Sequence, residues 1–517
     1  MKIPTKKDFR QISPYIWEIP KEFRSDMKVP ARVFISEKML DELLKEESTA
    51  LWQLINLATL PGIYKYSLAM PDIHSGYGSP IGGVVAFDIN QGIISPGICG
   101  YDINCGVRLL VTPFYYSEIK DKIPKLTQQI YKEVPSGVGE GGWWNLTEKE
   151  MENILQDGAQ YLLKLGYATQ KDIEHTESFG KLDGANPEKV SSTAKKRGKD
   201  QLGTIGAGNH FVEIQKVAQI FDEALAKKLN LDKDRVCVMI HCGSRGLGHQ
   251  VATDYIKAAL KFLNKNKIEI VDKELAYFHF NSSEARDYLE AMKSAANFAW
   301  ANRQYITYEI RKAFKKVFNE DIEIKQIYDV AHNIVKIEEY SELTPTIHKK
   351  ETSHQSSQLT IAGNYTYLNK NELGSSQKSM KLIIHRKGAT RAFWQGHQEL
   401  SHFFREIGQP ILIPGSMGTA SYVLIGQELA KDISFGSAPH GAGRVMSRTE
   451  AKKKIKGFEL KKELEAQGIS VAEGSLSGLA EEAPEAYKQV DEVVEVVHQI
   501  GIAKKVVKLK PLGVIKG

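Results

Sequence analysis

Six turns, most of them rich in glycine, punctuate the predicted strands of this chain, and each carries a polar side chain able to take part in chemistry. They are PDIHSGYGSPIGG (71–83), GTIGAGNHFVEIQ (203–215), IHCGSRGLGHQ (240–250), DVAHN (329–333), PGSMGTASYVL (414–424) and SAPHGAGR (437–444). Backbone N–H groups in such turns can approach a phosphate closely, and α/β proteins place ligands at the ends of strands. The repetition indicates that the fold gathers these turns around one cleft.

Apolar spacing predicts that helices and strands intermix along all 517 residues. Helices are predicted over 37–59, 147–166, 249–264, 283–317 and 485–501, and strands over 107–111, 235–240, 322–331, 381–385 and 410–414. The sequence contains no obvious linker and no internal repeat. We therefore expect an α+β (mixed α/β) fold in which one large domain, 1–517, has mixed sheets flanked by helices.

One segment differs from the rest in composition. Residues 344–379 are rich in Ser, Thr, Asn and Gln and poor in large apolar side chains. Such a segment is typical of a surface insertion or a flap within the domain. Its two histidines, His348 and His354, are expected to be solvated rather than bound to a metal.

The chain shows no sign of export. No apolar run reaches the length of a membrane span, and the start, MKIPTKKDFR, lacks the apolar core of a signal peptide. Four cysteines in so long a chain, Cys99, Cys105, Cys237 and Cys242, do not indicate a disulfide framework. We predict a cytoplasmic protein in which Cys105 is a free thiol or a metal ligand.

The net charge of +6 is modest, but basic residues are clustered at 194–199 (AKKRGK), 385–391 (HRKGATR) and 451–456 (AKKKIK). Clusters of this kind suit a polyanion whose phosphates displace counterions. A solvated surface also accounts for them, so charge alone favours nucleic acid only slightly.

A metal site is indicated by five residues on these turns. Asp102 and Cys105 lie three apart between glycines, and His210, His241 and His332 each lie at the edge of an apolar run. One such histidine is more often a hydrogen-bonded core residue, but three together with an Asp-x-x-Cys turn favour a metal. The set is too soft for Mg²⁺ or Ca²⁺ and suits Zn²⁺, Mn²⁺, Co²⁺ or Fe²⁺. Five ligands exceed a closed zinc site, which leaves room for two metals bridged by Asp102 and Cys105.

His440 is the candidate nucleophile. It follows Pro439 and precedes Gly441–Gly443, so that a rigid approach leads into a cradle of small residues. A neutral imidazole could attack the α-phosphate of a nucleotide to give a phosphoramidate, with Arg444 and backbone N–H groups holding the oxygens. The alternative is a turn histidine without a chemical role.

Together these segments resemble the RtcB family of RNA-splicing ligases. The resemblance extends through GYDINCGVR, KRGKDQLGTIGAGNHFVEIQ, HRKGATRAF, SAPHGAGRVMSR, EEAPEAYKQVDEVV and the final PLGVIKG, and it covers nearly all of the chain except 344–379. It implies an RtcB-like domain with a dimetal cleft.

The resemblance also implies an activity. Enzymes of this family join RNA ending in a 2′,3′-cyclic phosphate or 3′-phosphate to RNA with a 5′-hydroxyl, in tRNA splicing or RNA repair. They use GTP and two Mn²⁺ ions per active site, and pass through a GMP–histidine intermediate and a guanylylated RNA 3′-end. The implied partners are RNA, such as tRNA exon halves, and archease as a candidate activator; no membrane partner is implied.

The residues carried over from the family fall into four groups. His440 matches the guanylylated histidine. Asp102 and Cys105 match bridging metal ligands, His210 matches a ligand of one manganese, and His241 and His332 match ligands of the other. The GTP-binding positions are Asn209, His210, Phe211, Val212, Glu213, His332, Asn333, Pro414, Gly415, Ser416, Met417, Ser421, His440, Gly441, Ala442, Gly443, Tyr487 and Lys516. We assign Asp72, Arg245, Lys387 and Arg448 to RNA ends or transition-state charge, with structural ion pairs as the alternative.

Two other functions stay open from the sequence. A metal-dependent phosphodiesterase or phosphatase acting on RNA ends would keep the metal ligands without needing His440. A non-catalytic protein that binds RNA ends would bind RNA in a salt-sensitive way and join nothing.

Overall fold

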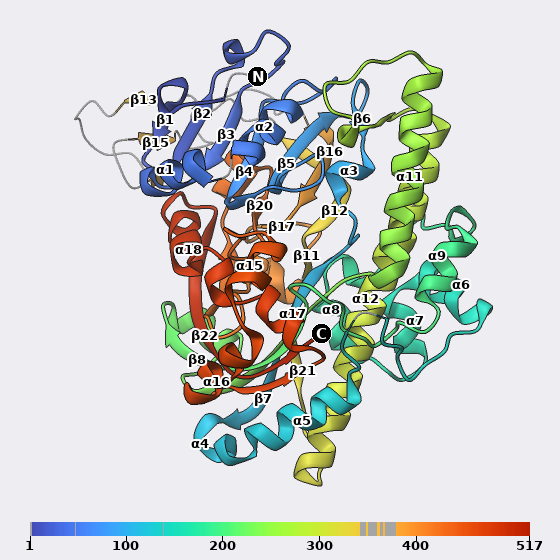
Figure 1. Ribbon diagram of the computed structural model, residues 1–517, viewed down its shortest axis with the longest axis vertical. Coiled ribbons are helices and arrows are strands. Elements are labelled where there is room, and N and C mark those ends of the chain that lie inside the picture. The colour runs from blue at the N-terminus through green and yellow to red at the C-terminus, as the bar shows by residue number, and fades with distance from the viewer. Residues whose placement is uncertain are drawn as a thin grey trace.

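Two large β-sheets hold most of the strands, and the chain passes between them more than once (Figure 1). The computed structural model describes residues 3–46, 48–137, 139–341, 348–349, 359–361, 365–367 and 379–517. The seven-stranded sheet has the order β1 (Arg10–Ser13), β2 (Ile16–Ile19), β3 (Ala31–Phe34), β4 (Ser67–His74), β5 (Ile81–Asp88), β16 (Ser379–Lys387) and β12 (Asn333–Ser341). The eight-stranded sheet has the order β11 (Lys325–Ala331), β7 (Gly106–Tyr115), β9 (Arg235–Cys242), β8 (Phe211–Ile220), β22 (Ala503–Lys516), β19 (Ser421–Gly426) and β18 (Pro410–Ile413), with β21 (Ser470–Glu473) paired to β22.

Each large sheet is mixed. Most neighbouring strands are antiparallel, but β3 pairs with β4 in parallel, and so does β21 with β22. Of the helices, α5 (Ile123–Glu133) and α18 (Val490–Gln499) pack against β22, and α12 (Ser283–Phe318) contacts β9. Helix α9 (Ser192–Gly198) packs on α11 (Arg245–Lys265), and α15 (Arg448–Lys454) packs on α17 (Leu476–Glu481). Helices α11 and α12 pack against each other along one flank (Figure 1). The predicted α+β fold is confirmed.

The eight-stranded sheet is buried on both faces, which explains the unbroken apolar runs of its central strands. Along β9, Val238 belongs to the same apolar cluster as Phe314 of α12, whereas Met239 belongs to the cluster on the other face. Side chains alternate between the faces of a strand, so a strand covered on both sides is apolar throughout. The same alternation directs His241 and Cys242, at the end of β9, to opposite faces.

A single residue separates strands of the two large sheets. Strand β11 ends at Ala331, and β12 begins at Asn333, where it pairs with Lys387 of β16. His332 and Asn333 are therefore held at the boundary between the two sheets.

A buried ion network anchors this boundary to α12. Asp329 of β11 accepts hydrogen bonds from Arg303 of α12, at 2.8 and 2.9 Å, and from Nε of Arg108 of β7 at 2.7 Å. All three side chains are fully buried. Although burial opposes the ionised form, the two guanidinium groups hold the pKa of the Asp329 carboxyl below its usual value.

The same guanidinium fixes two strand ends. Nη1 of Arg303 donates to the backbone carbonyls of Asn104 and Cys242, each at 2.8 Å. Asn104 precedes Cys105, and Cys242 follows His241. The position of both predicted metal ligands is therefore tied to one side chain of α12.

The predicted helices differ from the observed ones mainly where the structure divides one predicted helix into two. Helix 283–317 is confirmed as α12, and helix 249–264 begins earlier, at Arg245. Helix 147–166 is divided into α6 (Glu148–Asp157) and α7 (Ala159–Lys164) by Gly158, which has a φ of 56°. A Cβ there would lie 2.3 Å from the carbonyl oxygen of Gly180, so the break is built into the packing. Helix 37–59 is likewise divided into α1 (Glu37–Glu46) and α2 (Ser48–Leu57), and only Val490–Gln499 of 485–501 is α-helical.

The polar segment 344–379 lies largely outside the described residues, as does His354. The described parts include β13 (His348–Lys349), β14 (Leu359–Ile361) and β15 (Tyr365–Tyr367), which form a small antiparallel sheet. Ser341 of β12 stands opposite Ser379 of β16 in the antiparallel register, so the segment connects two paired strands at their ends. That it is an insertion within one ligase domain stays a prediction.

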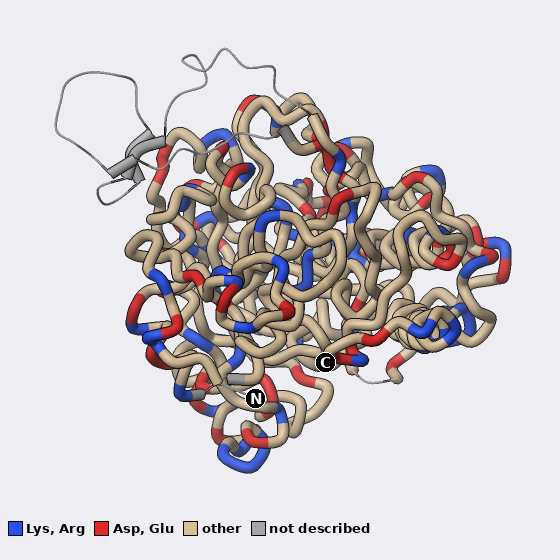
Figure 2. The backbone as a smooth tube through the Cα atoms, turned by 90° about the horizontal axis from the view of Figure 1, so that it is seen from above, with Lys and Arg blue, Asp and Glu red and all other residues tan. Residues whose placement is uncertain are grey.

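Charge is spread over the molecule rather than separated onto two faces. In Figure 2, Lys and Arg segments are interspersed with Asp and Glu segments along a backbone that is mostly neither. Among the described residues, no helix is both long enough and apolar enough to span a membrane.

The ion network predicts a large loss of stability on removing its central charge. Replacing Arg303 by Met leaves Asp329 buried without one of its two partners, which costs about 3–5 kcal/mol of unfolding free energy. Lys315→Met on the same helix removes an ion pair with Asp321 whose side chains are 60% and 84% exposed, and it should change stability by less than about 1 kcal/mol. Urea unfolding of both variants checks this. Equal midpoints for the two variants would show that the network is not what holds the strand ends.

Candidate active site

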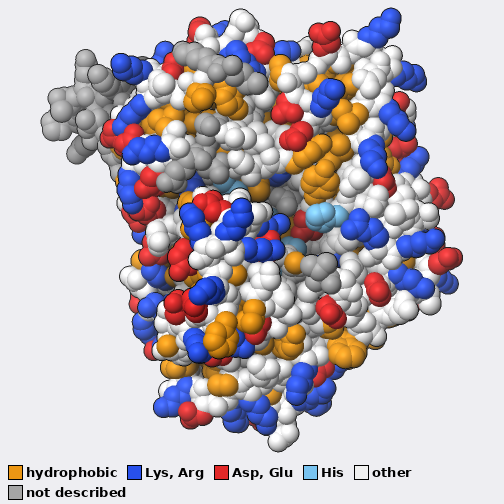
Figure 3. All heavy atoms as spheres, in the orientation of Figure 1, with side chains coloured by type: hydrophobic (Ala, Val, Ile, Leu, Met, Phe, Trp, Pro, Cys, Tyr) orange, Lys and Arg blue, Asp and Glu red, His pale blue; other side chains and the backbone are white. Residues whose placement is uncertain are grey.

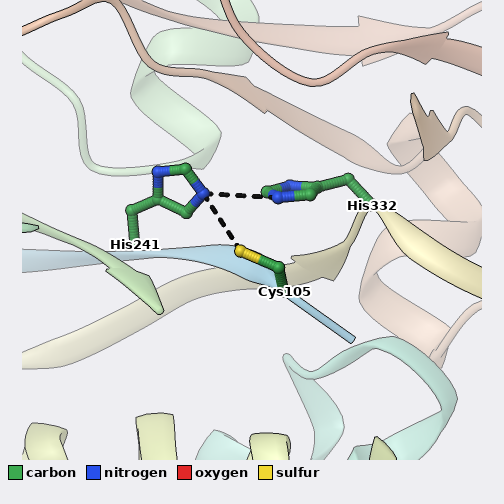
Figure 4. A group of neighbouring side chains, drawn as sticks. All are labelled: Cys105, His241 and His332. Carbon is green, nitrogen blue, oxygen red and sulfur yellow. Dashed lines mark hydrogen bonds between the residues drawn. The ribbon is translucent and has the colours of Figure 1, made fainter. Parts of the chain in front are cut away.

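The register of four neighbouring strands brings the predicted metal ligands to one edge of the eight-stranded sheet. Ala331 of β11 stands opposite Gly106 of β7, and His241 of β9 stands opposite both Val107 of β7 and Phe211 of β8. The residues just before or after these positions are Cys105, His210 and His332. Figure 4 shows Cys105, His241 and His332 converging from their separate strands.

The ligand atoms form two groups that share one sulfur. Sγ of Cys105 lies 3.2 Å from Nε2 of His210 and 3.4 Å from Nε2 of His241. Nε2 of His241 lies 3.3 Å from Nε2 of His332, and Nε2 of His210 lies 3.0 Å from Oδ2 of Asp102. Within each group, Cys105–His241–His332 and Asp102–Cys105–His210, all ligand atoms lie within 4.8 Å of one another.

The chemistry of these atoms fits divalent cations. Burial lowers the pKa of the His241 and His332 imidazoles below their usual value, which favours the neutral form that binds metals. Burial raises the pKa of the Cys105 thiol to about 12, so it needs a nearby positive charge to ionise. One thiolate, three imidazoles and one carboxylate suit a borderline transition metal better than Mg²⁺.

Asp102 is positioned by the turn that follows β9. Its Oδ1 accepts hydrogen bonds from the backbone N–H of Ser244 at 3.0 Å and from the Ser244 hydroxyl at 3.3 Å. A Cβ on Gly243 would lie 2.3 Å from Oδ1 of Asp102. The turn therefore needs glycine at this position, which explains part of the HCGSRG motif.

His440 is held by a carboxylate from a distant strand. Oδ2 of Asp72, on β4, lies 2.6 Å from Nδ1 of His440 and accepts the backbone N–H groups of His440 and Gly441 at 3.2 and 3.3 Å. A carboxylate only accepts, so Nδ1 carries the proton and Nε2 keeps its lone pair. The rings of His440 and His332 are 4.8 Å apart between centroids. The candidate nucleophile thus stands directly beside a metal ligand.

All six residues open onto one cleft of about 1010 Å³. Its lining includes Asp102, Cys105, His210, His241, His332 and His440. Cations also line it: Lys196, Arg197, Arg245, Lys387, Arg444 and Arg448. In the space-filling view, histidine side chains are visible near the middle of this face with Lys and Arg beside them (Figure 3). The cleft can hold both metal cations and the phosphates of a large anion.

Comparison with known proteins assigns the chain to a family. A family model described as tRNA-splicing ligase RtcB matches residues 53–373 and 343–517. Proteins named tRNA-splicing ligase RtcB from Archaeoglobus fulgidus, Thermococcus kodakarensis and Nanoarchaeum equitans are 46%, 47% and 48% identical to it. These alignments cover 98% of this chain and 98%, 98% and 99% of the respective relatives. The chain belongs to the RtcB family. The resemblance drawn from its motifs is confirmed.

The positions matched to GTP binding in the RtcB family are divided between the cleft surface and the layer behind it. Asn209, His210, His332, Asn333, Pro414, His440, Gly441, Ala442, Gly443 and Tyr487 line the cleft. Phe211, Val212, Glu213, Gly415, Ser416, Met417, Ser421 and Lys516 are buried and are not among the lining residues. Their assigned roles stay predictions.

Part of the buried layer carries acceptors without partners. Oε2 of Glu213 accepts from Nε2 of Gln215 at 2.7 Å, and the same nitrogen donates to Ser421 at 3.0 Å. Oε1 of Glu213 and Oδ1 of Asn209 have no hydrogen-bond partner among the described residues. Unpaired buried acceptors are costly, so this arrangement is expected of a site that receives a donor from a ligand. Lys516 lies nearby, with its ammonium 5.8 Å from the centre of the Phe211 ring.

The four residues assigned to RNA ends differ in their surroundings. Asp72 is fully buried, and its contact is with His440 rather than with the open cleft. Nζ of Lys387 donates to the carbonyls of Tyr77, Ser79 and Gly97.

Arg245 and Arg448 also differ in their exposure and in their partners. Arg245 is largely buried, and its Nε donates to Thr204 at 2.9 Å. Arg448 is 58% exposed and pairs with Glu481 and Glu482. Arg448 is the one of the four whose side chain is mostly open to a ligand.

Sequence patterns did not reveal several residues that shape this site. Arg303 and Asn302 lie in the Ala-rich middle of α12, and Asn302 donates to the carbonyls of Thr204 and Gly243. A pair of polar residues within the buried face of a long helix is the signal that could have found them. Gln215, which bridges Glu213 and Ser421, carries no such signal.

The sharing of Cys105 predicts how metal content responds to substitution. Cys105→Ala should abolish binding of both ions, because it removes a ligand from each group, whereas His332→Ala should leave about one ion bound. Metal is measured by mass spectrometry after Mn²⁺ loading and gel filtration, with His402→Ala, a 93% exposed histidine far along the chain, as control. Retention of two ions by Cys105→Ala would contradict the shared site.

Proposed function

We propose that this protein is an RNA ligase of tRNA splicing that joins RNA with a 2′,3′-cyclic phosphate or 3′-phosphate to RNA with a 5′-hydroxyl. It uses GTP and passes through guanylylated His440. The observation that carries the proposal is the placement of His440 in the same cleft as the metal ligands. Its Nδ1 is bound to Asp72, and its ring stands 4.8 Å from that of His332.

Guanylylation follows from the geometry around His440. Nε2 attacks the α-phosphorus of GTP, so that a P–N bond forms and the P–O bond to pyrophosphate breaks. The Nδ1 proton stays in its hydrogen bond to Asp72, which stabilises the positive charge that develops on the ring. Residues 441–443 have no large side chain, which leaves room for the phosphate oxygens beside the ring, although the N–H of Gly441 is already donated to Asp72.

Selection of guanine is assigned to Glu213. Its free Oε1 and its partner oxygen can accept the N1–H and 2-amino groups of guanine, which adenine does not offer in this arrangement. Lys516 on β22 contributes a positive charge close to this carboxyl.

The later steps transfer GMP and then release it. An oxygen of the RNA 3′-phosphate attacks the phosphorus on His440, breaks the P–N bond and frees the imidazole; a cyclic phosphate is first hydrolysed to the 3′-phosphate. The 5′-hydroxyl then attacks the activated 3′-phosphate, loses its proton and expels GMP. GMP is a better leaving group than a phosphate oxygen, which explains why the reaction passes through guanylylated His440.

Two metal ions are assigned to the two ligand groups, with Cys105 shared, and Asp102 is proposed as a second bridging ligand. When bound, such ions neutralise developing charge on phosphate oxygens. The donor set suits several borderline divalent metals, and Mn²⁺ is proposed among them because the resemblance to the RtcB family implies it. The use of tRNA exon halves, activation by archease and a cytoplasmic location stay predictions.

The two alternative functions lack a role for part of this geometry. A phosphodiesterase or phosphatase would not need a carboxylate that fixes the tautomer of His440. A protein that only binds RNA ends would need neither His440 as a nucleophile nor the two carboxylate oxygens of Glu213 as acceptors.

Labelling with α-³²P-GTP tests the proposal. Wild-type protein should acquire an acid-labile, base-stable label, and His440→Ala should acquire none. Asp72→Asn keeps the shape of the side chain but no longer fixes the His440 proton on Nδ1, so the ring can adopt the tautomer with its proton on Nε2. The substitution should slow labelling on the order of 100-fold or more. If Asp72 served only the fold, a folded Asp72→Asn variant would acquire label at the wild-type rate. Label on His440→Ala would reject the nucleophile.

GTP affinity should rise with pH near neutrality. Burial raises the pKa of the Glu213 carboxyl to about 7, and only the ionised form accepts both guanine donors. Protons therefore compete with guanine, and affinity should fall by up to about tenfold per unit as the pH drops below 7. Calorimetry on the His440→Ala background between pH 6 and pH 8 measures this without covalent chemistry. Glu213→Gln should remove this part of the pH dependence; identical profiles for the two proteins would exclude Glu213 from guanine binding.

A further inference from the structure

Three aromatic side chains form a row on the wall of the cleft. The rings of Tyr77 and Tyr101 meet edge to face with centroids 5.2 Å apart. The ring of His249, in the first turns of α11, lies nearly parallel to Tyr101 at 5.8 Å and 25°. All three residues line the cleft, and none has a role in the mechanism above.

The row stands beside the metal ligands and ends in an open ring. Tyr101, the middle ring, immediately precedes Asp102, so the row passes one residue from a proposed metal ligand. Tyr77 and Tyr101 are partly buried, whereas His249 is exposed. One ring therefore presents a face to the cleft, and two others support it from behind.

Cations accompany this row. Lys196 and Arg197 of α9 are exposed and line the same cleft. Nη1 of Arg197 donates to Oε1 of Gln250, the residue after His249, at 3.0 Å. A guanidinium is thus fixed next to the exposed ring, with its remaining donors available.

An aromatic face with adjacent cations has the chemistry of a site for single-stranded nucleic acid. Every base has a π-face that can stack on an aromatic ring, and the backbone phosphate next to it attracts Lys and Arg. The guanine of GTP is a poorer occupant, because the row lacks the carboxylate that would accept the guanine donors.

We propose that His249, supported by Tyr101 and Tyr77, stacks against the terminal base of an RNA substrate while Arg197 and Lys196 hold its phosphate. The proposal rests on the RNA-ligase function and specifies where one RNA end is seated. Stacking would place the end of the strand beside the metal ligands, where its phosphate or hydroxyl reacts. His249 is then a positioning residue for RNA and takes no part in guanylylation.

Removal of the ring should weaken RNA binding specifically. Base stacking lost on alanine substitution corresponds to about a 5- to 150-fold weaker Kd, so His249→Ala should raise the Kd and KM for RNA within that range. His249→Phe, which restores a ring, should bind within about threefold of wild type. His402→Ala, an exposed histidine on α13 (His402–Ile407), should bind as wild type. Equal Kd values for His249→Ala and wild type would overturn the proposal.

RNA lacking one terminal base decides whether the contact is to a base and at which end. Fluorescence anisotropy is measured with RNAs that are abasic at the 3′-phosphate end or at the 5′-hydroxyl end. At the end that is seated on the row, base removal should weaken binding to wild type but not to His249→Ala, because both changes remove the same stack. The end that shows this non-additivity is the one bound. Additive losses at both ends would reject stacking on His249, even if the variant binds weakly.

The ligase function and the stacking of RNA on His249 can fail separately. If wild-type protein neither acquires label from GTP nor joins RNA, the ligase function fails. If wild-type protein does both, and His249→Ala joins RNA with an unchanged KM, only the stacking proposal fails. Labelling of His440 by GTP in His249→Ala should stay within about twofold of wild type, since RNA takes no part in that step; a large loss would mean that the row serves the nucleotide or the metals instead.

Discussion

The rest of the site depends on the hydrogen bonds that the guanidinium of Arg303 makes. It binds Asp329 of β11 and the carbonyls that flank Cys105 and His241, all inside the protein. A buried charge that loses its partners is strongly destabilising. Moving any one of the three strand ends away from Arg303 therefore costs free energy of folding. Metal sites require ligands held to within a fraction of an ångström. A long helix packed behind the sheet supplies that rigidity here.

Burial around this network shapes the cleft in a second way. It keeps the two imidazoles His241 and His332 and the thiol of Cys105 neutral, and it holds Glu213 near its ionisation point. Asp102 and His210 differ: although burial opposes their ionised forms, neighbouring groups hold the pKa of the Asp102 carboxyl below its usual value and that of the His210 imidazole above it. In the proposed function, divalent cations would restore the thiolate and guanine the carboxylate that burial disfavours, which would couple binding to ionisation. The exposed cations Lys196 and Arg197 stay at the outer part of the cleft, where water solvates them.

Local patterns predicted the parts of the site that lie at strand ends. Cys105, His241 and His332 follow from apolar runs that end in polar turns, since neighbouring strands that end together bring such residues together. Asp72 and His440 are 368 residues apart, and no spacing in the chain indicates that they touch. The same holds for the row of Tyr77, Tyr101 and His249, which comes from two separate turns and the start of α11. The helix break at Gly158 was missed for a related reason: apolar spacing continues through it, and only the approach of a distant backbone forces the turn.

The boundary between the two large sheets explains why the proposed nucleophile and the proposed metal ligands share one cleft. Asp72 belongs to the seven-stranded sheet, Cys105 and His241 belong to the edge of the eight-stranded sheet, and His332 is the residue between them. A shift of one sheet against the other would change the contact between His332 and His440 at the same time as the ligand geometry. Because the N–H of His332 donates to the carbonyl of Cys105 at 2.8 Å, and the N–H of Asn104 donates to the carbonyl of Asn333 at 2.7 Å, such a shift would also break backbone hydrogen bonds. The alignment of His440, the proposed nucleophile, with the proposed metal ligands is therefore a property of how the sheets join, and not of any one motif.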